Sequence, residues 1–318
     1  MDKIANVKVS VIIPTYNRAS LIGITLDSFC KQNYPKELYE VIVVDNNSTD
    51  NTFEVVNAYT IKYDNIKYIK ESRAGATFAR HNGAKNAFSE YLIFADDDGI
   101  FNESCIEEIL KIYNSNVEVG AVGGKIEILW DNPPPIWVVE HERFLGKLDY
   151  GSEILIAKKL YINGGLFSIK KSVLYELKGF NPDLIGEYLV GDGDTGLCNK
   201  IHKSKYYIGW TPHAKMQHMQ FVNKNATIED IGRRYYNHGL CLSYAFYKTN
   251  NYKLNKSVLK YFMESLYKFS KQLIKHYILN NQNNNDVFYL MSRKGHLVFF
   301  LNCLSKEYRL SCKREDWF

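Results

Sequence analysis

The sequence predicts an α/β fold built on a mostly parallel, Rossmann-like sheet with helices on both faces, followed by a C-terminal helical segment. A strand, a polar loop and a helix recur four times in the first hundred residues, which is the pattern of a parallel sheet. Polar runs follow three of those strands directly. Beyond about residue 226, apolar residues keep the three-to-four spacing of amphipathic helices.

The elements of the first half are identified by their apolar patterns. Short apolar runs predict strands at residues 7–13, 39–44, 66–69 and 91–95, and helical spacing predicts helices at 19–31, from 53 onward and at 76–88. Ligands of parallel α/β sheets bind outside the carboxyl ends of the strands. Because polar runs lie at such ends, we expect them to converge on one cleft: residues 14–18, 45–50 and 96–98.

The pattern is less regular after residue 118. We expect a strand-pair element at 119–129, a stiff aromatic loop at 130–137, a loop entering a strand at 163–169, a helix that ends near 203, and strands at 206–210 and 212–218. Amphipathic spacing predicts one helix at 259–277 and a second at 287–304. The predicted organisation is a catalytic domain at 1–225 and a basic helical region at 226–318.

Composition excludes several classes of protein. The 318 residues are 46% hydrophobic and 24% charged, as expected for a soluble globular protein. No segment reaches the roughly 18 uninterrupted apolar residues of a membrane span, and the N-terminus lacks a signal-peptide pattern. The six cysteines have no CxxC spacing, so we expect reduced cytosolic thiols. The absence of GxGxxG and GxxxxGK[ST] argues against a dinucleotide Rossmann domain and a P-loop enzyme.

The net charge of +5 is concentrated in the C-terminal segment, where residues 251–318 carry 12 Lys and Arg against 5 Asp and Glu. Three roles remain open for this amphipathic region: packing on the catalytic domain, contact with an anionic membrane surface, or a homodimer contact. We therefore expect a cytoplasmic protein, free or peripheral on the inner face of the membrane. Nucleic acid is not an expected partner, because the rest of the chain is slightly acidic.

Three adjacent aspartates, Asp96, Asp97 and Asp98, follow the strand at 91–95 directly. Their mutual repulsion costs stability unless a positive charge is held beside them. Carboxylate oxygens suit Mg²⁺ or Mn²⁺, and strand alternation points Asp96 and Asp98 the same way and Asp97 elsewhere. The alternative is a solvated acidic turn that caps a helix starting near Glu103. The accompanying motifs favour the metal site.

Four motifs stand in order in the first hundred residues: VIIPTYNR (11–18), VVDNNSTD (43–50), ARHNGA (79–84) and FADDD (94–98). Together they resemble glycosyltransferase family 2, and the resemblance covers residues 7 to about 220. It implies the GT-A fold and an inverting transfer of a sugar from a nucleotide-diphospho-sugar. Residues 1–118 would then form the nucleotide-sugar-binding half and 119–225 the acceptor half.

The resemblance implies a nucleotide-binding set of residues. Pro14, Thr15 and Tyr16 would line the base pocket, with Tyr16 stacked on the base. Asp45 would accept a hydrogen bond from the N3–H of uracil, with a helix N-cap as its alternative role. Others would approach the phosphates, the ribose or the aspartate cluster: Arg18, Arg73, Arg80, Asp96 and Asp97.

The resemblance also implies a metal site and a general base. Asp98, Asp96 and His218 would hold Mn²⁺ or Mg²⁺ on the diphosphate, with His213 the less favoured histidine. In this family a Gly-Phe motif is usually followed by a helix that begins with Glu-Asp. Here Gly179-Phe180 is present and Asp194 matches the aspartate, but Gly193 stands where the glutamate is usual. Asp194 is the preferred base and Asp192 the alternative, with helix capping the competing role for both.

On the acceptor side we expect two tryptophans and two glycines to border the sugar, with ordinary packing as the alternative: Trp130, Trp137, Gly164 and Gly165. The resemblance implies a UDP-sugar donor and a glycan or lipid-linked acceptor in cell-surface polysaccharide synthesis. A sugar nucleotidyltransferase is disfavoured, because it would carry a Gly-rich basic loop where PTYNR stands. A glycan- or nucleotide-binding protein without turnover has only the departure at Gly193 in its favour.

Overall fold

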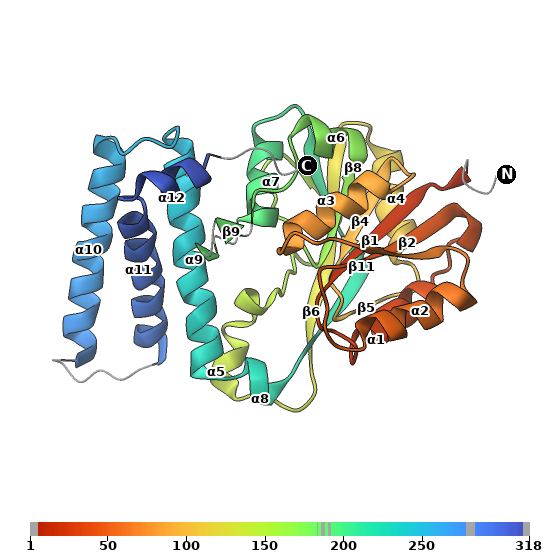
Figure 1. The fold of residues 1–318 in the computed structure, drawn as a ribbon, viewed down its shortest axis with the longest axis horizontal. Coiled ribbons are helices and arrows are strands. Elements are labelled where there is room, and N and C mark those ends of the chain that lie inside the picture. The colour runs from red at the N-terminus through yellow and green to blue at the C-terminus, as the bar shows by residue number, and fades with distance from the viewer. Residues whose placement is uncertain (1–5, 183, 186–187, 190–191, 278–283, 314–318) are drawn as a thin grey trace.

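The protein is described by a computed structural model that covers residues 6–182, 184–185, 188–189, 192–277 and 284–313 (Figure 1). One large sheet forms its centre, with strand order β3-β2-β1-β4-β8-β6-β11-β5 and β7 paired to β11. The four N-terminal strands run parallel: β1 (Val9–Thr15), β2 (Tyr39–Asp45), β3 (Ile66–Lys70) and β4 (Tyr91–Ala95). The remaining strands are β5 (Gly99–Phe101), β6 (Val119–Trp130), β7 (Leu155–Ala157), β8 (Leu166–Lys170) and β11 (Tyr207–Gln220).

Helices cover both faces of this sheet, which confirms the predicted fold class. On one face the core is closed by α1 (Ile22–Cys30), α2 (Thr52–Lys62) and α4 (Cys105–Ser115). On the other face it is closed by α3 (Ala76–Asn86), α6 (Lys171–Glu176) and α7 (Gly193–His202). Strands such as β2 are buried along their whole length because both faces are covered, which explains their continuous apolar runs.

The parallel register brings the carboxyl ends of the strands to one edge. Thr15 at the end of β1 pairs with Asp45 at the end of β2, and β4 lies on the other side of β1. The loop after β4 is also attached to a distant strand, because the Met219 amide donates to the Asp98 carbonyl at 3.0 Å. This bond fixes the aspartate loop against β11.

The second half of the sheet differs from the sequence prediction in two strands. Residues 119–130 form a single strand, β6, instead of a strand pair, and residues 207–220 form a single strand, β11, instead of two. The register of β11 against β6 shifts between Thr211 and Lys215, beside Pro212, so a bulge absorbs the proline without ending the strand. The aromatic segment after β6 contains a helical turn, α5 (Ile136–Val139), and is followed by the short helix η3 (Glu142–Leu145).

The C-terminal segment is helical, as predicted. It contains α8 (Val222–Asn225), α9 (Ile228–Thr249), α10 (Lys256–Tyr277), α11 (Asn284–Asn302) and α12 (Lys306–Ser311). Figure 1 shows α9 next to the sheet domain, α11 beyond it and α10 outermost. Glycines allow α9 and α11 to touch, since a Cβ at Gly239 would lie 2.0 Å from the carbonyl oxygen of Ser292. Among the described helices, none is long and apolar enough to cross a membrane.

Gly83 in α3 explains one residue of the ARHNGA motif. A Cβ at this position would lie 2.3 Å from Cγ2 of Ile12 and 3.1 Å from Cγ2 of Val44, so the helix packs directly on the sheet. We expect Gly83→Ala to lower the free energy of unfolding by about 1–3 kcal/mol, because a filled core must shift. Chemical denaturation measures this. Gly23→Ala is the matched control, since its Cβ would meet nothing closer than 3.5 Å; an equal loss there would contradict the packing argument.

Candidate active site

A cavity of about 560 Å³ opens where the carboxyl ends of β1 and β4 meet the C-terminal part of β11 and the start of α9. It brings together nine of the residues predicted from sequence: Pro14, Thr15, Tyr16, Arg18, Arg80, Asp96, Asp97, Asp98 and His218. Tyr16 is 58% exposed, which leaves its ring free at the surface of the cavity. The second polar run, 45–50, reaches the cavity through Asn46, so the prediction that the three runs converge is confirmed.

Asp96 is positioned by α3 and by the loop before β8. Its carboxylate lies 3.2 Å from Nη2 of Arg80, and its backbone amide donates to the Gly165 carbonyl at 3.3 Å. Arg80 also approaches the Gly164 carbonyl, at 3.5 Å. Its Nε is buried and has no hydrogen-bond partner in the part of the chain that the structure describes. That unpaired donor leaves Arg80 with capacity for an anionic ligand.

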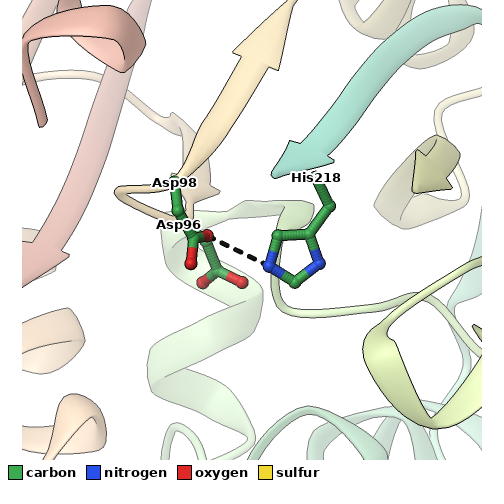
Figure 2. Close-up of side chains that lie close together, drawn as sticks. All are labelled: Asp96, Asp98 and His218. Atoms are coloured by element: carbon green, nitrogen blue, oxygen red, sulfur yellow. Dashed lines mark ion pairs between the residues drawn. The ribbon is translucent and has the colours of Figure 1, made fainter. Parts of the chain in front are cut away.

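Asp97 and Asp98 both face Arg18. Nε of Arg18 lies 3.4 Å from Asp97, and Nη2 lies 3.5 Å from Asp98. Nε2 of His218 lies 3.0 Å from Oδ1 of Asp98, as Figure 2 shows. A hydrogen bond between the ring of His218 and the backbone of Leu145 restrains its orientation. A backbone acceptor of this kind is the usual support for a metal-binding imidazole.

Burial places the acidic groups under electrostatic stress. Burial raises the pKa of Asp97 to about 7, with the charge of Asp98 adding to the rise. Burial likewise raises the pKa of Asp96, against the lowering effect of Arg80. Burial would also raise the pKa of Asp98, but His218 and Arg18 outweigh it, and this pKa lies below its usual range. A cation beside these carboxylates would favour the charged form of all three.

The donor set suits a divalent cation. One ligand atom from each of Asp96, Asp98 and His218 can be chosen so that the three lie within 4.8 Å of one another. Figure 2 shows the three side chains pointing toward a common point. Two carboxylate oxygens and one imidazole nitrogen suit a hard or borderline ion such as Mg²⁺ or Mn²⁺, and three protein ligands leave positions open for ligand oxygens. The residues present therefore fit the predicted metal.

Asp194 lies beside this cluster on the first turn of α7. Its Oδ2 accepts a hydrogen bond from the Gly164 amide at 2.8 Å, and its charge acts on Asp96. Gly164 and Gly165 thus lie between the two acids. A Cβ at Gly165 would be 3.0 Å from Oδ2 of Asp96, so the backbone approaches the site closely there.

Asp192, the alternative base, is only 1% exposed. It accepts a hydrogen bond from Nδ2 of Asn181 at 2.8 Å, and Asn181 in turn accepts one from Lys248 of α9 at 2.6 Å. Burial raises its pKa to about 6, against the effect of Asn181. These contacts attach α9 to the start of α7, so Asp192 has a structural role.

Besides Asp192, Asp194, Gly164 and Gly165, four more predicted residues lie outside the lining of the cavity. Asp45 is engaged by the Ser48 amide at 2.8 Å and the Tyr68 hydroxyl at 2.5 Å. Arg73 forms an ion pair with Glu71 at 2.8 Å. Two aromatic residues pack toward the C-terminal helices: Trp137, which stacks on Phe288, and Trp130, whose indole donates to Glu142. Their roles with nucleotide or acceptor remain predictions.

Sequence reasoning missed the wall that α8 and α9 provide. Lys224, Arg233 and Arg234 line the cavity together with Asp230. Nε of Arg234 lies 2.8 Å from Asp230, and its Nη1 donates to the Phe144 carbonyl at 3.1 Å. Arg233 pairs with the same carboxylate and is mostly exposed. The adjacent arginines in the chain were a visible signal, but no motif connected them to the aspartates.

Known proteins resemble this chain in sequence. A model of the family described as "Glycosyl transferase family 2" matches residues 10–177. The chain is 38% identical over 113 residues to a poly(ribitol-phosphate) beta-glucosyltransferase of Bacillus spizizenii, covering 35% of this chain and 17% of that protein. The first curated relatives are matched over 17% to 49% of their own length.

Two solved structures share the fold. A mannosyltransferase from Pyrobaculum calidifontis, in complex with GDP-Man and Mn²⁺, has a TM-score of 0.58 at 20% identity, covering 98% of this chain and 84% of that one. TarS 1-349 from S. aureus, in complex with UDP-GlcNAc, has a TM-score of 0.51 at 16% identity, covering 90% of each chain. These likenesses confirm the GT-A architecture of the sheet and its helices.

Proposed function

The chain belongs to glycosyltransferase family 2, and from this premise we propose that it transfers a sugar from a nucleotide-diphospho-sugar to a hydroxyl group of a glycan or lipid-linked acceptor. The observation that carries the proposal is the cluster of Asp96, Asp98 and His218 at the edge of a cavity lined by arginines. Such a cavity has the charge pattern that a metal-bound diphosphate requires.

The donor is proposed to lie along the cavity, with its base near Pro14, Thr15 and Tyr16. A divalent ion held by the cluster would neutralise the diphosphate as it leaves. Arg80 offers an unpaired buried Nε in the same cavity. Lys224 is exposed at the α8 side, and its side chain has no ion pair or hydrogen bond among the described residues. Both cations are therefore available for the phosphates.

Asp194 is the proposed general base. It is half-buried beside Asp96 but does not line the donor cavity, so it can face an acceptor that enters from the α7 side. A carboxylate on the side opposite to the leaving diphosphate removes the proton of the attacking hydroxyl, and the sugar is transferred with inversion. Asp192 is less suited to this role, because it is buried and its Oδ2 is hydrogen-bonded to Asn181.

The nucleotide is proposed to be uridine diphosphate. Its supports are the motif-based role of Asp45 and the UDP-GlcNAc complex of one structural neighbour. The other neighbour was solved with GDP-Man, so the shared fold accommodates more than one base. Relatives whose names include poly(ribitol-phosphate) favour an acceptor in a cell-surface polysaccharide. A nucleotide-binding protein without turnover is the alternative that the intact Asp194 and metal cluster disfavour.

A thermal-shift panel tests the donor site. UDP, GDP, CDP and dTDP are each added with and without Mn²⁺, at about 100 times the dissociation constant, where binding adds roughly 2.7 kcal/mol of stability. We expect a Mn²⁺-dependent rise in melting temperature with UDP alone. A rise with another nucleotide would change the proposed base but support the proposed donor site. No rise with any nucleotide would contradict the proposed donor site.

We further propose that residues 226–318 form a separate C-terminal region. This region would make a peripheral membrane contact that brings the enzyme to a lipid-linked acceptor. A homodimer contact is the competing role for the same helices. The supporting observation is the outer helix, α10, whose long apolar side chains remain exposed at several positions: Leu259, Met263, Tyr267 and Ile274.

A further inference from the structure

Helix α10 has two apolar sides, whereas its sequence suggested one. The inner side packs on α11 through residues such as Val258, which is fully buried, and Phe262, whose ring lies 5.6 Å from that of Phe300. Amphipathic packing on the protein requires only this inner side. The remaining apolar residues of α10 therefore need a separate explanation.

The outer side of α10 carries an apolar stripe that only the exposed Ser270 interrupts. Every member has another member three, four or seven residues away along the chain, which places them all on one helical face. Their exposed fractions are 52% for Leu259, 58% for Met263, 37% for Leu266, 67% for Tyr267, 38% for Leu273 and 49% for Ile274. At about 1.5 Å per residue, the stripe extends roughly 22 Å along the helix. Single exposed apolar residues are ordinary, but six of them gathered on one face of one helix mark an interaction surface.

Cations border this stripe on one side. Lys268, Lys271 and Lys275 of α10 and Arg293 of α11 line a groove of about 560 Å³ whose other walls include Ile274 and Tyr289. Asp286 pairs with Lys275 at 2.9 Å, and Glu264 approaches Lys260 only at 4.0 Å. Lys268 and Lys271 have no ion pair among the residues that the structure describes. The groove therefore presents uncompensated positive charge beside exposed apolar side chains.

We propose that the outer stripe of α10 and the adjoining cationic groove form a docking surface for a membrane that contains anionic phospholipid. Apolar side chains would enter the boundary between headgroups and acyl chains while the lysines contact the phosphates, as in other interfacial helices. Each Lys or Arg near such a surface strengthens binding roughly fivefold. This inference rests on the proposed peripheral contact and not on the transfer reaction, so the two can fail separately.

Charge favours lipid over a second copy of the chain as the occupant. A two-fold contact that covered both the stripe and the groove would set two cationic grooves against each other, because the same patch meets itself in a symmetric dimer. Like charges facing each other in a partly desolvated contact are destabilising. An anionic bilayer instead complements both parts of the surface at once.

Vesicle co-sedimentation of the full chain tests the proposal. We expect binding to phosphatidylcholine vesicles that contain about 30% phosphatidylglycerol, and much weaker binding to vesicles of phosphatidylcholine alone. The variant Lys268→Glu/Lys271→Glu should lower the partition coefficient at least tenfold, and Met263→Asp/Tyr267→Asp should lower it as well. Lys31→Glu/Lys85→Glu is the matched control, since both lysines are exposed on the sheet domain and change the net charge equally.

Each outcome decides the proposal. Equal binding of the groove variant and the control, or no binding of the wild type to anionic vesicles, would overturn it. A concentration-dependent dimer in light scattering that Met263→Asp/Tyr267→Asp disrupts would assign the stripe to a second copy instead. Circular dichroism and the nucleotide panel should be unchanged in every variant. That result shows that the chain is folded and that lipid binding fails or succeeds independently of the donor site.

Discussion

Asp194→Asn is expected to abolish sugar transfer while leaving nucleotide binding intact. General bases contribute about 10²- to 10⁴-fold to rate, and an amide cannot accept the proton of the acceptor hydroxyl. The amide oxygen of Asn can still accept the hydrogen bond from the Gly164 amide, so the first turn of α7 should keep its position. Release of the nucleoside diphosphate in the presence of an acceptor glycan fraction measures turnover, and the thermal-shift panel measures binding.

Asp192→Asn is the matched control for this experiment. Asp192 is buried and anchors Asn181, so the variant should lose stability rather than the chemical step. We expect a lower melting temperature with turnover that remains measurable below it. If the Asp192 variant lost turnover at unchanged stability while the Asp194 variant retained it, the two roles would be exchanged.

Asp98→Asn is expected to remove metal-dependent nucleotide binding. The change deletes a charged ligand, and the loss of one charge near a bound diphosphate complex should weaken binding by at least tenfold. His218 also loses the carboxylate at 3.0 Å that holds its pKa above the ordinary value. The Mn²⁺-dependent shift should disappear in the nucleotide panel. Glu107→Gln, an exposed substitution on α4, controls for the change in net charge; an undiminished Mn²⁺ shift in the Asp98 variant would remove Asp98 from the metal site.

The same pair predicts a pH dependence of the metal-free protein. The raised pKa of His218 gives stability that is complete below about pH 6.5 and is lost as pH rises through the folded value. The lowered pKa of Asp98 gives stability that is present above about pH 3.9 and is lost as pH falls. The pair therefore stabilises most between these values, and Asp98→Asn should flatten the stability profile there. Metal binding should strengthen in the opposite direction, as His218 loses its proton.

The sequence alone was sufficient to predict the part of the cavity that the carboxyl ends of the strands form. Local apolar runs locate β1 and β4, and parallel pairing then forces Thr15 and the loop after Ala95 to the same edge. His218 could be added only through the family resemblance, because it lies more than a hundred residues away and on a strand that pairs with β5 by long-range contacts. Pattern alone gives no register for such a strand.

Contacts with other elements explain why some predicted residues lie outside the cavity lining and why other lining residues were missed. Trp130 and Trp137 are aromatic, but Trp130 donates to Glu142 of η3 and Trp137 stacks on Phe288 of α11. Asp45 stands at a strand end, yet Tyr68 of the neighbouring strand occupies one of its oxygens. Arg234 reaches the cavity only because α9 is anchored to Phe144. None of these partners follows from local spacing.

The position of α9 limits where such enzymes can exchange C-terminal segments. One of its ends supplies Asp230 and Arg234 to the cavity, while Lys248 near the other end holds Asn181. Between them, Gly239 touches the backbone of α11. A chimera that exchanges C-terminal segments between relatives at residue 225 would therefore replace part of the donor pocket along with the outer helices. A crossover after Thr249 would transfer α10 to a new host while each catalytic half keeps its own pocket wall.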